Sequence, residues 1–519
     1  MTTAIHDTKD GTPVEFEDAV SATGYGVYNL SLLLVCGGLL MAVIMETISM
    51  SYILPAAQCD LELTLSDKSM LSAVSFLGVV LSSMLWGYLG DTVGRKKVVL
   101  ITTLVSFIVS LASSFSPYTW LFITLRFFNG FFIGGPSAVT YAYLGEFHNN
   151  VHRARVLSWA AAFIAFAMFT LPALAWLVLP MQWAITLPGT SPQFTWRPWR
   201  LLIILNAIPG LISASCLLMF PESPKFLWVN GRTDEVLNIF RKMYARNTGK
   251  PESEYPVKQI VEHSKQLTDN GTRKATMLLK SVWQQTAPLF CVPLILKTLM
   301  TCTLQFGVFA SSSGILMWTP ELLNRMSFFM NVNPNTTVTV CTAFHYKQNT
   351  TTKQIGTNIN EDCSDVVDEE VFRISLILGA VFAMGYILIG VVINLTGKKI
   401  LLAVMLALSG VSGLCLNVVQ DYVLLVVMMA LFLMAGTCVG IINTIVVDIY
   451  PTRYRAMAMA ISLMLGRFGA VAGSNILGSL LEYSCQLSLY IFAGEYLVLV
   501  VIALLLPIPF QAHHHTATM

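Results

Sequence analysis

The chain has 519 residues, of which 55% are hydrophobic and only 12% are charged, and its mean hydropathy is +0.66. Soluble globular proteins carry about 25% charged residues, so this composition predicts an integral membrane protein. The formal net charge is only +2, which offers no overall field to a polyanion and argues against nucleic acid as a partner. A spanning helix needs about 20 apolar residues, so a chain of this length can hold about a dozen spans and their loops.

Apolar stretches of spanning length follow one another along the chain, bounded by Pro, Gly or charged residues. They predict twelve transmembrane helices, at about 30–54, 69–89, 97–115, 119–143, 156–180, 200–220, 295–318, 373–393, 400–419, 423–446, 456–482 and 486–507. We therefore expect an all-α membrane protein with two bundles of six helices. The expected divisions are a tail at 1–28, a first bundle at 29–220, a linker at 221–293, a second bundle at 294–507 with an outer loop at 320–372, and a tail at 508–519.

The Lys and Arg residues are distributed unevenly between the two sides of the predicted membrane. Most of them follow the second, fourth, sixth, eighth and tenth spans, and these include the cations of the linker. Cytoplasmic loops carry an excess of Lys and Arg, so we expect both termini and the linker in the cytoplasm. The sequence leaves open whether the membrane is the plasma membrane or that of an intracellular vesicle.

The predicted outer loop carries two acceptor sequences for N-glycosylation, at Asn335 and Asn349. Glycans are added on the lumenal or extracellular side, which agrees with the side assigned to this loop by the cations. We expect both asparagines to be glycosylated.

Two cysteines, Cys341 and Cys363, lie in the same loop. Disulfides persist on the lumenal or extracellular side, so we expect these two residues to pair. The spacing does not fix this connectivity, because Cys59 and Cys485 also reach the outer side.

One motif occurs twice, after the second span of each half. Gly87-Tyr-Leu-Gly-Asp91-Thr-Val-Gly94-Arg95-Lys96 recurs as Gly390-Val-Val-Ile-Asn394-Leu-Thr-Gly397-Lys398-Lys399. A second match has nearly the same offset, since Glu146 and Arg153 after span four correspond to Asp448 and Arg455 after span ten. The two halves are therefore predicted to be parallel structural repeats, as in transporters whose substrate site lies between two bundles.

The repeated motif has a clear physical interpretation. Glycines let the helix ends approach closely, Asp91 can pair with a cation or accept from a helix N-terminus, and Arg95 and Lys96 suit the anionic inner surface. We interpret it as a latch for one conformational state. In the second copy Asn394 replaces the Asp, so this latch is expected to lack a charge pair and to be weaker. A tight loop with no latch function is the alternative.

Charged residues at the inner ends of two spans in each half are predicted to form networks that gate the inner side. These residues are Glu146, Arg153, Asp448 and Arg455. Solvated loop charges without a gating role are the alternative.

Several motifs carry a resemblance to a known family. Gly87 to Lys97, the pattern Arg126-x-x-x-Gly130-x-x-x-Gly134 and the twelve-span repeat resemble the major facilitator superfamily over essentially the whole chain. Within it, Leu54-Pro55, Cys59-Asp60-Leu61, Leu157-Ser158-Trp159, Trp196 to Arg200 and Pro221-Glu-Ser-Pro-Lys-Phe-Leu227 are similar to synaptic vesicle glycoprotein 2-related and organic-ion transporters. Sugar porters share the Pro-Glu-Ser-Pro motif. The Pro-Glu-Thr usual after span twelve is replaced by Pro507-Ile508-Pro509.

A charge inside the membrane costs about 2.5 to 3.5 kcal/mol on insertion scales unless it is paired or faces water. Glu46 lies roughly 13 Å below the outer end of span one, and Arg126 lies roughly 12 Å below the same surface on span four. The resemblance implies that both spans line a central cavity, so we expect the two side chains to meet. They form either a coupling switch or a permanent ion pair. Val43 stands where related transporters often carry a second acidic residue, which weighs against proton coupling.

Arg467 falls near the middle of span eleven, and no acidic residue of spans seven to twelve is expected at its depth. Its neighbours Gly466, Gly469 and Gly473 indicate close helix contact. Arg467 either binds an anionic group or bonds to backbone carbonyls of a broken helix, and we favour the second interpretation.

The remaining candidates for a substrate cavity are aromatic and uncharged polar residues. They are Trp159 and Phe163 on span five, Gln305, Phe309 and Ser312 on span seven, and Asn443 on span ten. Together they would make an aromatic-walled site for a modest organic molecule or cation, with ordinary packing as the alternative for each residue. Trp318 is expected to lie just below the outer boundary, where it could be an interfacial anchor.

No enzymatic motif is present, so we expect no enzyme activity, no cofactor and no metal site. The function predicted is a secondary active or facilitative transporter of a small organic solute, working by alternating access as a monomer in the lipid bilayer. Glu46 and the aromatic residues favour an organic cation, while Gln305 and Asn443 leave a sugar open. A proton or another coupling ion is left open as a partner. The alternative class is a membrane receptor or trafficking protein that has kept the fold but moves no solute.

Overall fold

The computed structural model describes residues 13–186, 194–261, 283–284, 286–333, 339–346 and 367–507. The long helices of the first half are α2 (Val27–Ile48) with α3 (Met50–Ala57), α4 (Leu65–Thr92), α5 (Arg95–Ser114), α6 (Thr119–Gly145), α7 (Asn150–Val178) and α8 (Pro198–Leu217). Those of the second half are α12 (Ile295–Val332), α14 (Glu369–Thr396), α15 (Lys398–Cys415), α16 (Tyr422–Leu433) with η3 (Met434–Thr437) and α17 (Cys438–Ile449), α18 (Thr452–Tyr483) and α19 (Cys485–Leu505).

The helices of the structure correspond to the twelve predicted spans. Among the described residues, 11 helical segments are long and apolar enough to cross a membrane. The twelfth is α6, whose 27 residues pack along α4 and α5. Because α2 with α3, and α16 with η3 and α17, each form one interrupted span, the helices fall into two sets of six, which is the predicted fold class.

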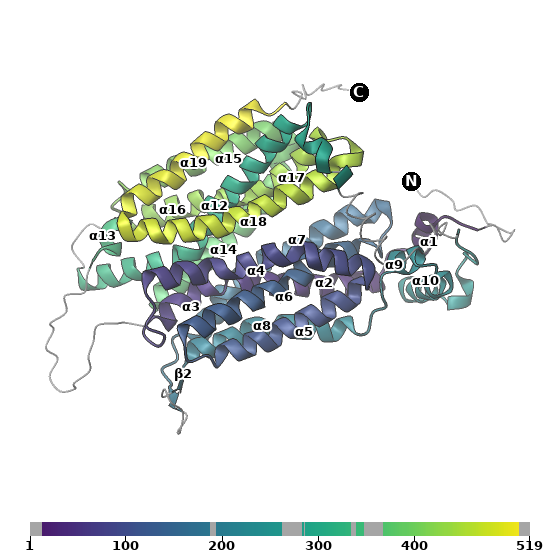
Figure 1. Ribbon diagram of the computed structural model, residues 1–519, viewed down its shortest axis with the longest axis horizontal. Coiled ribbons are helices and arrows are strands. Elements are labelled where there is room, and N and C mark those ends of the chain that lie inside the picture. Colours follow the sequence, from purple (N-terminus) through teal and green to yellow (C-terminus); the bar gives the residue numbers. More distant parts are fainter. Residues whose placement is uncertain are drawn as a thin grey trace.

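The two sets form two bundles that meet along a seam. In Figure 1 the purple and blue helices of the first half lie below the green and yellow helices of the second half. The seam is made by α4 against α18, α7 against α14, and α3 against α12. Helices α5 and α8 pack on other helices of their own bundle, away from this seam.

Glycine lets helices within a bundle approach until backbones touch. A Cβ on Gly130 of α6 would lie 2.1 Å from the carbonyl oxygen of Ser75 on α4. In the second bundle, a Cβ on Gly473 of α18 would lie 2.0 Å from the carbonyl oxygen of Ala310 on α12. The close contact predicted from the glycines around Arg467 is therefore present.

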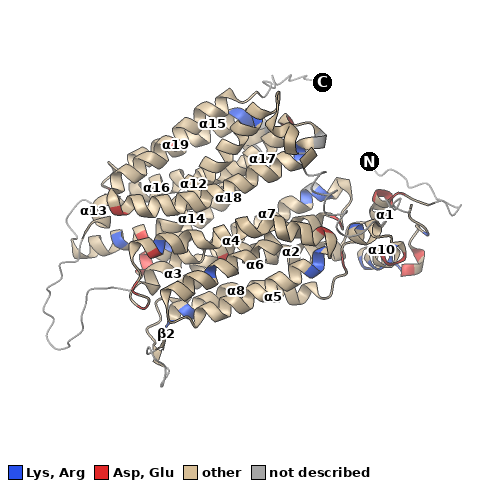
Figure 2. Ribbon diagram, viewed as in Figure 1, with Lys and Arg blue, Asp and Glu red and all other residues tan. Residues whose placement is uncertain are grey.

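The two ends of the bundles differ in what they carry (Figure 1). One end, which we name the linker side, carries the helices α1 (Phe16–Ala22), α9 (Pro224–Val229) and α10 (Thr233–Thr248). The opposite end, which we name the loop side, carries α13 (Val340–Phe344) and the hairpin of β1 (Ile185–Thr186) and β2 (Thr195–Trp196). Figure 2 shows that charged residues gather at these two ends and are sparse between them.

The tail before α2 packs against the linker instead of standing apart from it. The ring of Phe16 in α1 (Phe16–Ala22) stacks on Trp228 with centroids 5.0 Å apart. The Tyr255 hydroxyl, which follows the short helix η1 (Glu252–Glu254), donates to the Ala19 carbonyl at 2.6 Å. The short helix η2 (Ala287–Phe290) precedes α12. Tail and linker thus share one hydrophobic core with the linker-side part of the first bundle.

On the loop side, α12 does not stop where the polar sequence begins. It continues through Pro320 to Val332, so the helix contains the first part of the segment expected to be an outer loop. The glycosylation candidates Asn335 and Asn349 lie outside the described residues.

The predicted disulfide between Cys341 and Cys363 is wrong. Cys341, in α13, is bonded to Cys485 at the start of α19. Cys59 is also disulfide-bonded, and Cys363 lies outside the described residues. The prediction paired two cysteines of the same loop, whereas packing of α13 on the start of α19 brings in a partner 144 residues away along the chain.

Peptide mapping under non-reducing conditions checks this connectivity. We expect a cross-linked pair of peptides that contains Cys341 and Cys485, because the two Cα atoms lie 5.4 Å apart. The Cys485→Ser variant should lose that pair and leave a Cys341 thiol that can be alkylated. A peptide joining Cys341 to Cys363 in the native protein would contradict the assignment.

Candidate functional site

Glu46 and Arg126 meet inside the first bundle, as predicted. The Arg126 Nη1 lies 3.4 Å from Glu46 Oε2, and the two side chains are 0% and 2% exposed. The Ser110 hydroxyl on α5 lies 2.9 and 2.8 Å from the two carboxylate oxygens of Glu46. The pair is thus closed off by a third helix, which favours a permanent ion pair over a group exposed to a cavity.

Polar groups of α5 and α6 complete this cluster. Ser113 accepts a hydrogen bond from Arg126, and the guanidinium lies 5.5 Å from the centre of the Phe122 ring. Asn129 donates to the hydroxyls of Ser106 at 3.0 Å and Ser110 at 3.1 Å. Hydroxyl groups at intervals of three or four residues along α5 therefore supply the hydrogen bonds that a buried charge pair needs.

The first copy of the repeated motif forms an ion-pair network on the linker side. Arg95 pairs with Asp91 at 3.0 Å and also with Glu146 at the end of α6. Ser223, which follows α8, donates to the same Glu146 carboxylate and accepts from Arg95. The Asp91 side chain is 70% exposed, whereas that of Glu146 is 10% exposed, so Glu146 is the stronger partner.

Glu222 of the Pro-Glu-Ser-Pro motif caps the start of α5. Its carboxylate accepts from the backbone N–H of Lys96 at 2.8 Å and of Ser223 at 3.0 Å. Lys96 donates through Nζ to the carbonyls of Leu218 at 3.1 Å and Phe220 at 2.5 Å. An acid at a helix N-terminus satisfies free N–H groups there, so this contact fastens the beginning of the linker to the first bundle.

The second copy has equivalent contacts. Lys398 pairs with Asp448 at 2.5 Å, as Arg95 pairs with Glu146, and Lys399 donates to the Leu506 carbonyl at 2.9 Å. The expectation that this copy lacks a charge pair is therefore wrong, because the residue after Gly397 supplies the cation. The Lys398 and Asp448 side chains are 34% and 44% exposed, so solvent weakens the pair, as expected for the second latch.

The two arginines predicted to join these networks lie elsewhere. Arg153 donates to the Gly145 carbonyl at 2.9 Å and pairs with Glu17 of the tail at 3.2 Å instead of with Glu146. Arg455 makes no ion pair with a described residue, and its Nε is buried without a hydrogen-bond partner. The inner networks are built by Arg95 and Lys398, and each stays within its own half of the chain.

Arg467 of α18 reaches across the seam. Its Nη1 donates to the Ser83 hydroxyl on α4 at 2.8 Å, and its Nη2 donates to the Ser137 hydroxyl on α6 at 3.0 Å. The prediction that it bonds to backbone carbonyls of a broken helix is wrong, because the partners are side chains of the opposite bundle. Within the part of the chain that the structure describes, Arg467 has no carboxylate partner.

The other predicted cavity residues form two separate groups. Gln305 donates to Asn443 at 3.4 Å, and Phe309 lies beside it, since a Cβ on Gly466 would meet both Gln305 and Phe309. Ser312, one turn further along α12, donates to the Val308 carbonyl at 2.6 Å. This group belongs to the second bundle.

The second group lies on α7 of the first bundle. Phe163 packs on α2, where a Cβ on Gly37 would lie 2.5 Å from its ring. Trp159 is 45% exposed. Trp318 is 2% exposed and donates to the Ser474 carbonyl at 3.2 Å, so it packs between α12 and α18 and is not an interfacial anchor.

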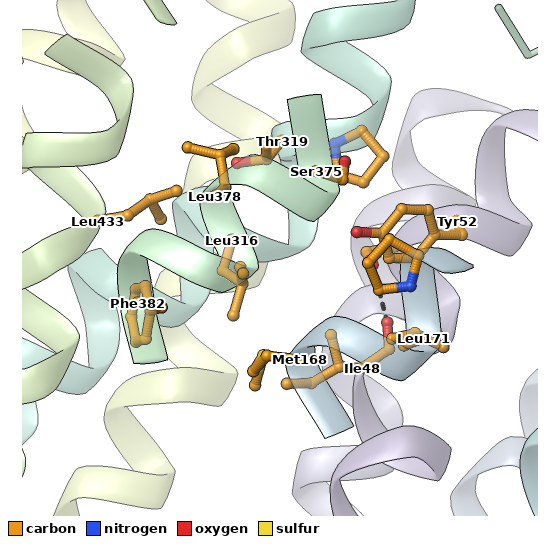
Figure 3. Close-up of a pocket in the computed structure, with 14 residues that line it drawn as sticks. Ile48, Tyr52, Met168, Leu171, Leu316, Thr319, Ser375, Leu378, Phe382 and Leu433 are labelled. Atoms are coloured by element: carbon orange, nitrogen blue, oxygen red, sulfur yellow. Dashed lines mark hydrogen bonds between the residues drawn. The ribbon is translucent and has the colours of Figure 1, made fainter. Parts of the chain in front are cut away.

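A pocket lies on the seam nearer the loop side, and none of the predicted cavity residues lines it. It encloses about 470 Å³ of space, its open mouth included. Figure 3 shows that α2, α3 and α7 of the first bundle and α12, α14 and α16 of the second supply the lining. The labelled residues are Ile48, Tyr52, Met168, Leu171, Leu316, Thr319, Ser375, Leu378, Phe382 and Leu433. The wall is mainly apolar, with a few hydroxyl groups.

Two charged contacts were not found from the sequence. Lys68 of α4 pairs with Glu321 of α12 at 2.8 Å across the seam, and both side chains are buried. Glu495, in the middle of α19, accepts from the Ser311 hydroxyl at 2.5 Å. Lys68 lies just before the predicted span at 69–89, and Glu321 lies just inside the predicted outer loop at 320–372, so neither falls within a predicted span. A search for every charged residue within the apolar stretches would have found Glu495.

Two repeated bundles of six helices, meeting at a seam with a pocket and polar contacts, are the architecture of a class of secondary transporters. The family model described as Major Facilitator Superfamily matches residues 34–342 and 367–518. The chain belongs to the Major Facilitator Superfamily.

The predicted resemblance to synaptic vesicle glycoprotein 2 is also confirmed. Synaptic vesicle glycoprotein 2B of Mus musculus is 30% identical over 327 residues, which cover 60% of this chain and 47% of that protein. Synaptic vesicle glycoprotein 2A of Rattus norvegicus is 28% identical over 328 residues, which cover 60% and 44%. The chain thus spans about half the length of these relatives.

Solved structures support the fold. The inward-open xylose transporter XylE from E. coli matches with a TM-score of 0.62 and 15% identity, covering 94% of this chain and 97% of that chain. A D-xylose-proton symporter matches with a TM-score of 0.61 and 14% identity, covering 92% and 97%.

Exchanging the charges of Glu46 and Arg126 tests the buried pair. Glu46→Arg or Arg126→Glu alone leaves like charges buried together, so we expect each to destabilise the protein by about 3–5 kcal/mol. The double variant should recover part of that loss, which thermal unfolding of the purified protein would measure. Additive losses in the double variant would rule out a direct interaction.

Glu146→Gln tests the network on the linker side. Loss of the charge that holds Arg95 and Ser223 should free the segment around Ser223, so we expect about tenfold faster amide exchange at residues 222–226. Asp91→Asn is the matched control, because its exposed pair should change the exchange rate by about twofold or less. Equal effects of the two substitutions would show that Glu146 has no special role.

Proposed function

We propose that the chain is a secondary active or facilitative transporter that moves a small organic solute by alternating access. The observation that carries this proposal is the contact of Arg467 with Ser83 and Ser137 across the seam. A guanidinium at mid-span is costly unless it is compensated or faces water. Among the described residues, the hydrogen bonds to Arg467 come from neutral hydroxyls of the other bundle. These bonds must be exchanged for others whenever the bundles move, which is what a substrate site requires.

The contacts on the two sides of the seam support a state that is closed on the loop side. There, α3 packs on α12 and Lys68 pairs with Glu321. On the linker side, the charged networks around Arg95 and Lys398 stay within their own bundles. If the linker side is cytoplasmic, as the Lys and Arg distribution predicts, this state faces inward.

The charge of the solute depends on which buried charge becomes available during the cycle. The sequence favours an organic cation because of Glu46, but Glu46 is already neutralised by Arg126 and enclosed by α5. Arg467 has no acidic partner among the described residues and lies at the seam. A second candidate, an organic anion whose carboxylate or similar group replaces the two hydroxyls at Arg467, is therefore better supported by the geometry.

The same experiment tests two alternative functions. The xylose transporters named above and the Gln305–Asn443 pair support a sugar. A receptor or trafficking protein that moves no solute is the other alternative.

The names of the synaptic vesicle relatives support a vesicle membrane. We further propose a monomer in the lipid bilayer, with a proton as the first coupling ion to test because one structural neighbour is a proton symporter.

Uptake into liposomes by the purified full chain tests the proposal. The panel contains labelled organic anions, organic cations and hexoses, each with and without an inward proton gradient. We expect saturable uptake of an organic anion, reduced about tenfold or more by Arg467→Gln, because a charge-assisted hydrogen bond is worth about 1.5–3 kcal/mol.

Arg241→Gln is the matched control, since Arg241 lies on α10 outside the bundles and should leave uptake unchanged. Uptake of an organic cation that is abolished by Glu46→Gln would contradict the organic anion and support the organic cation that the sequence favours. Uptake of no compound by protein shown to be folded would favour the receptor alternative.

A further inference from the structure

The loop-side end of the seam is closed by a lysine with partners in both bundles. Lys68 donates through Nζ to Gln58 at 2.6 Å in its own bundle and to Glu321 at 2.8 Å in the other. Its side chain is 2% exposed and that of Glu321 is 7% exposed. Next to it, a Cβ on Gly478 of α18 would lie 2.0 Å from the Ser69 hydroxyl. The bundles are therefore in close contact beside the ion pair that joins them.

The ion pair cannot persist when the bundles separate on this side. Lys68 stands on α4 and Glu321 on α12, so rocking that opens the loop side pulls the two charges apart. Each charge must then be hydrated or paired anew, which is favourable only if water or solute enters the opening. An ion pair in this position acts as a gate whose strength sets the balance between the two states.

The carboxylate of Glu321 also accepts a hydrogen bond from Arg325, which links it to α13. Arg325, one helical turn further along α12, donates through Nε to Glu321 at 2.9 Å. Its Nη1 donates to the Phe344 carbonyl at 3.0 Å, and the guanidinium lies 4.3 Å from the centre of the Phe344 ring. Arg325 therefore connects the carboxylate of the gate to α13.

Helix α13 is itself joined by a disulfide to α19, the last helix of the second bundle. Phe344 is its last residue, and Cys341 in the same short helix is disulfide-bonded to Cys485 at the start of α19. A displacement of α13 is therefore transmitted through Arg325 to Glu321, while the disulfide limits how far α13 can move.

We propose that Lys68 and Glu321 form the loop-side gate of the transport cycle and that Arg325 is the positioning residue through which α13 controls this gate. The inference rests on the proposed alternating-access function and adds to it a route by which a displacement of α13 changes the transport state. No contact between the loop and the solute is needed for this control.

Accessibility of two single-cysteine reporters tests the gate in the full chain. Ser375→Cys reports the loop side, because Ser375 is buried and lines the seam pocket. Thr444→Cys reports the linker side, because Thr444 is exposed on α17. The accessible free cysteines Cys216, Cys291 and Cys415 are first replaced by serine, and the disulfides are kept.

We expect Lys68→Gln and Glu321→Gln each to raise maleimide labelling at the loop-side reporter about fivefold or more and to lower it at the linker-side reporter. Arg325→Gln should shift both reporters in the same directions by a smaller factor. The exchange Lys68→Glu with Glu321→Lys should return labelling toward the native pattern. Arg373→Gln is the matched control, since Arg373 pairs with Glu370 at the exposed start of α14 and should shift neither reporter.

Opposite changes at the two reporters separate gating from loss of structure. Faster labelling at both reporters would mean that the substitution loosens the fold, and unchanged labelling would mean that the pair is not a gate. Either result overturns the inference. A shift with Lys68→Gln but none with Arg325→Gln would overturn the positioning role of Arg325. The assay needs no solute, so it can fail while the uptake experiment succeeds, and the reverse also holds.

Discussion

Backbone contact between glycine-bearing helices is the interaction on which the rest of the structure depends. In a bilayer there is little hydrophobic drive for one helix to join another, so close packing and hydrogen bonds have to hold a bundle together. Gly130 brings α6 onto the backbone of α4, and Gly473 brings α18 onto the backbone of α12. These contacts make each bundle a unit that can move as a whole, and they leave the seam as the place where the chain can change shape.

The charged groups are divided in the same way between the bundles and the seam. Glu46 with Arg126, Arg95 with Glu146, and Lys398 with Asp448 are each joined within one half of the chain. A rocking motion leaves such pairs intact, so they stabilise the bundles in every state. Lys68 with Glu321, and Arg467 with two serines, join opposite halves. Only contacts of this second kind favour one state over another, because only they differ between the states.

The sequence predicted the features that depend on local pattern. Twelve apolar stretches, a repeated glycine motif and two ionisable residues at equal depth are visible along the chain, and the spans, the two bundles and the Glu46–Arg126 contact followed from them. The predictions that fail concern partners chosen by packing. Cys341 bonds to a residue at the start of α19, and Arg467 bonds to serines whose unremarkable sequence context gave no signal. Glu321 escapes prediction because the sequence favours an end of the helix at Pro320. The helix in fact continues to Val332, and a proline inside a spanning helix is tolerated when neighbouring helices satisfy the backbone groups that it frees.

Helix α4 carries one residue of each seam contact, Lys68 of the ion pair and Ser83 of the Arg467 hydrogen bonds, and their spacing indicates how far each contact moves when the bundles rock. Lys68 and Ser83 lie on this one helix, separated by roughly 22 Å at 1.5 Å per residue. If the bundles rock about an axis near the middle of the membrane, displacement grows with distance from that axis, so Lys68 moves far and Ser83 moves little. The strong, buried ion pair is therefore placed where a small rotation breaks it. The weaker bonds of Arg467 are placed where they can be exchanged without large movement, which is where a solute bound between the bundles would meet both halves at once.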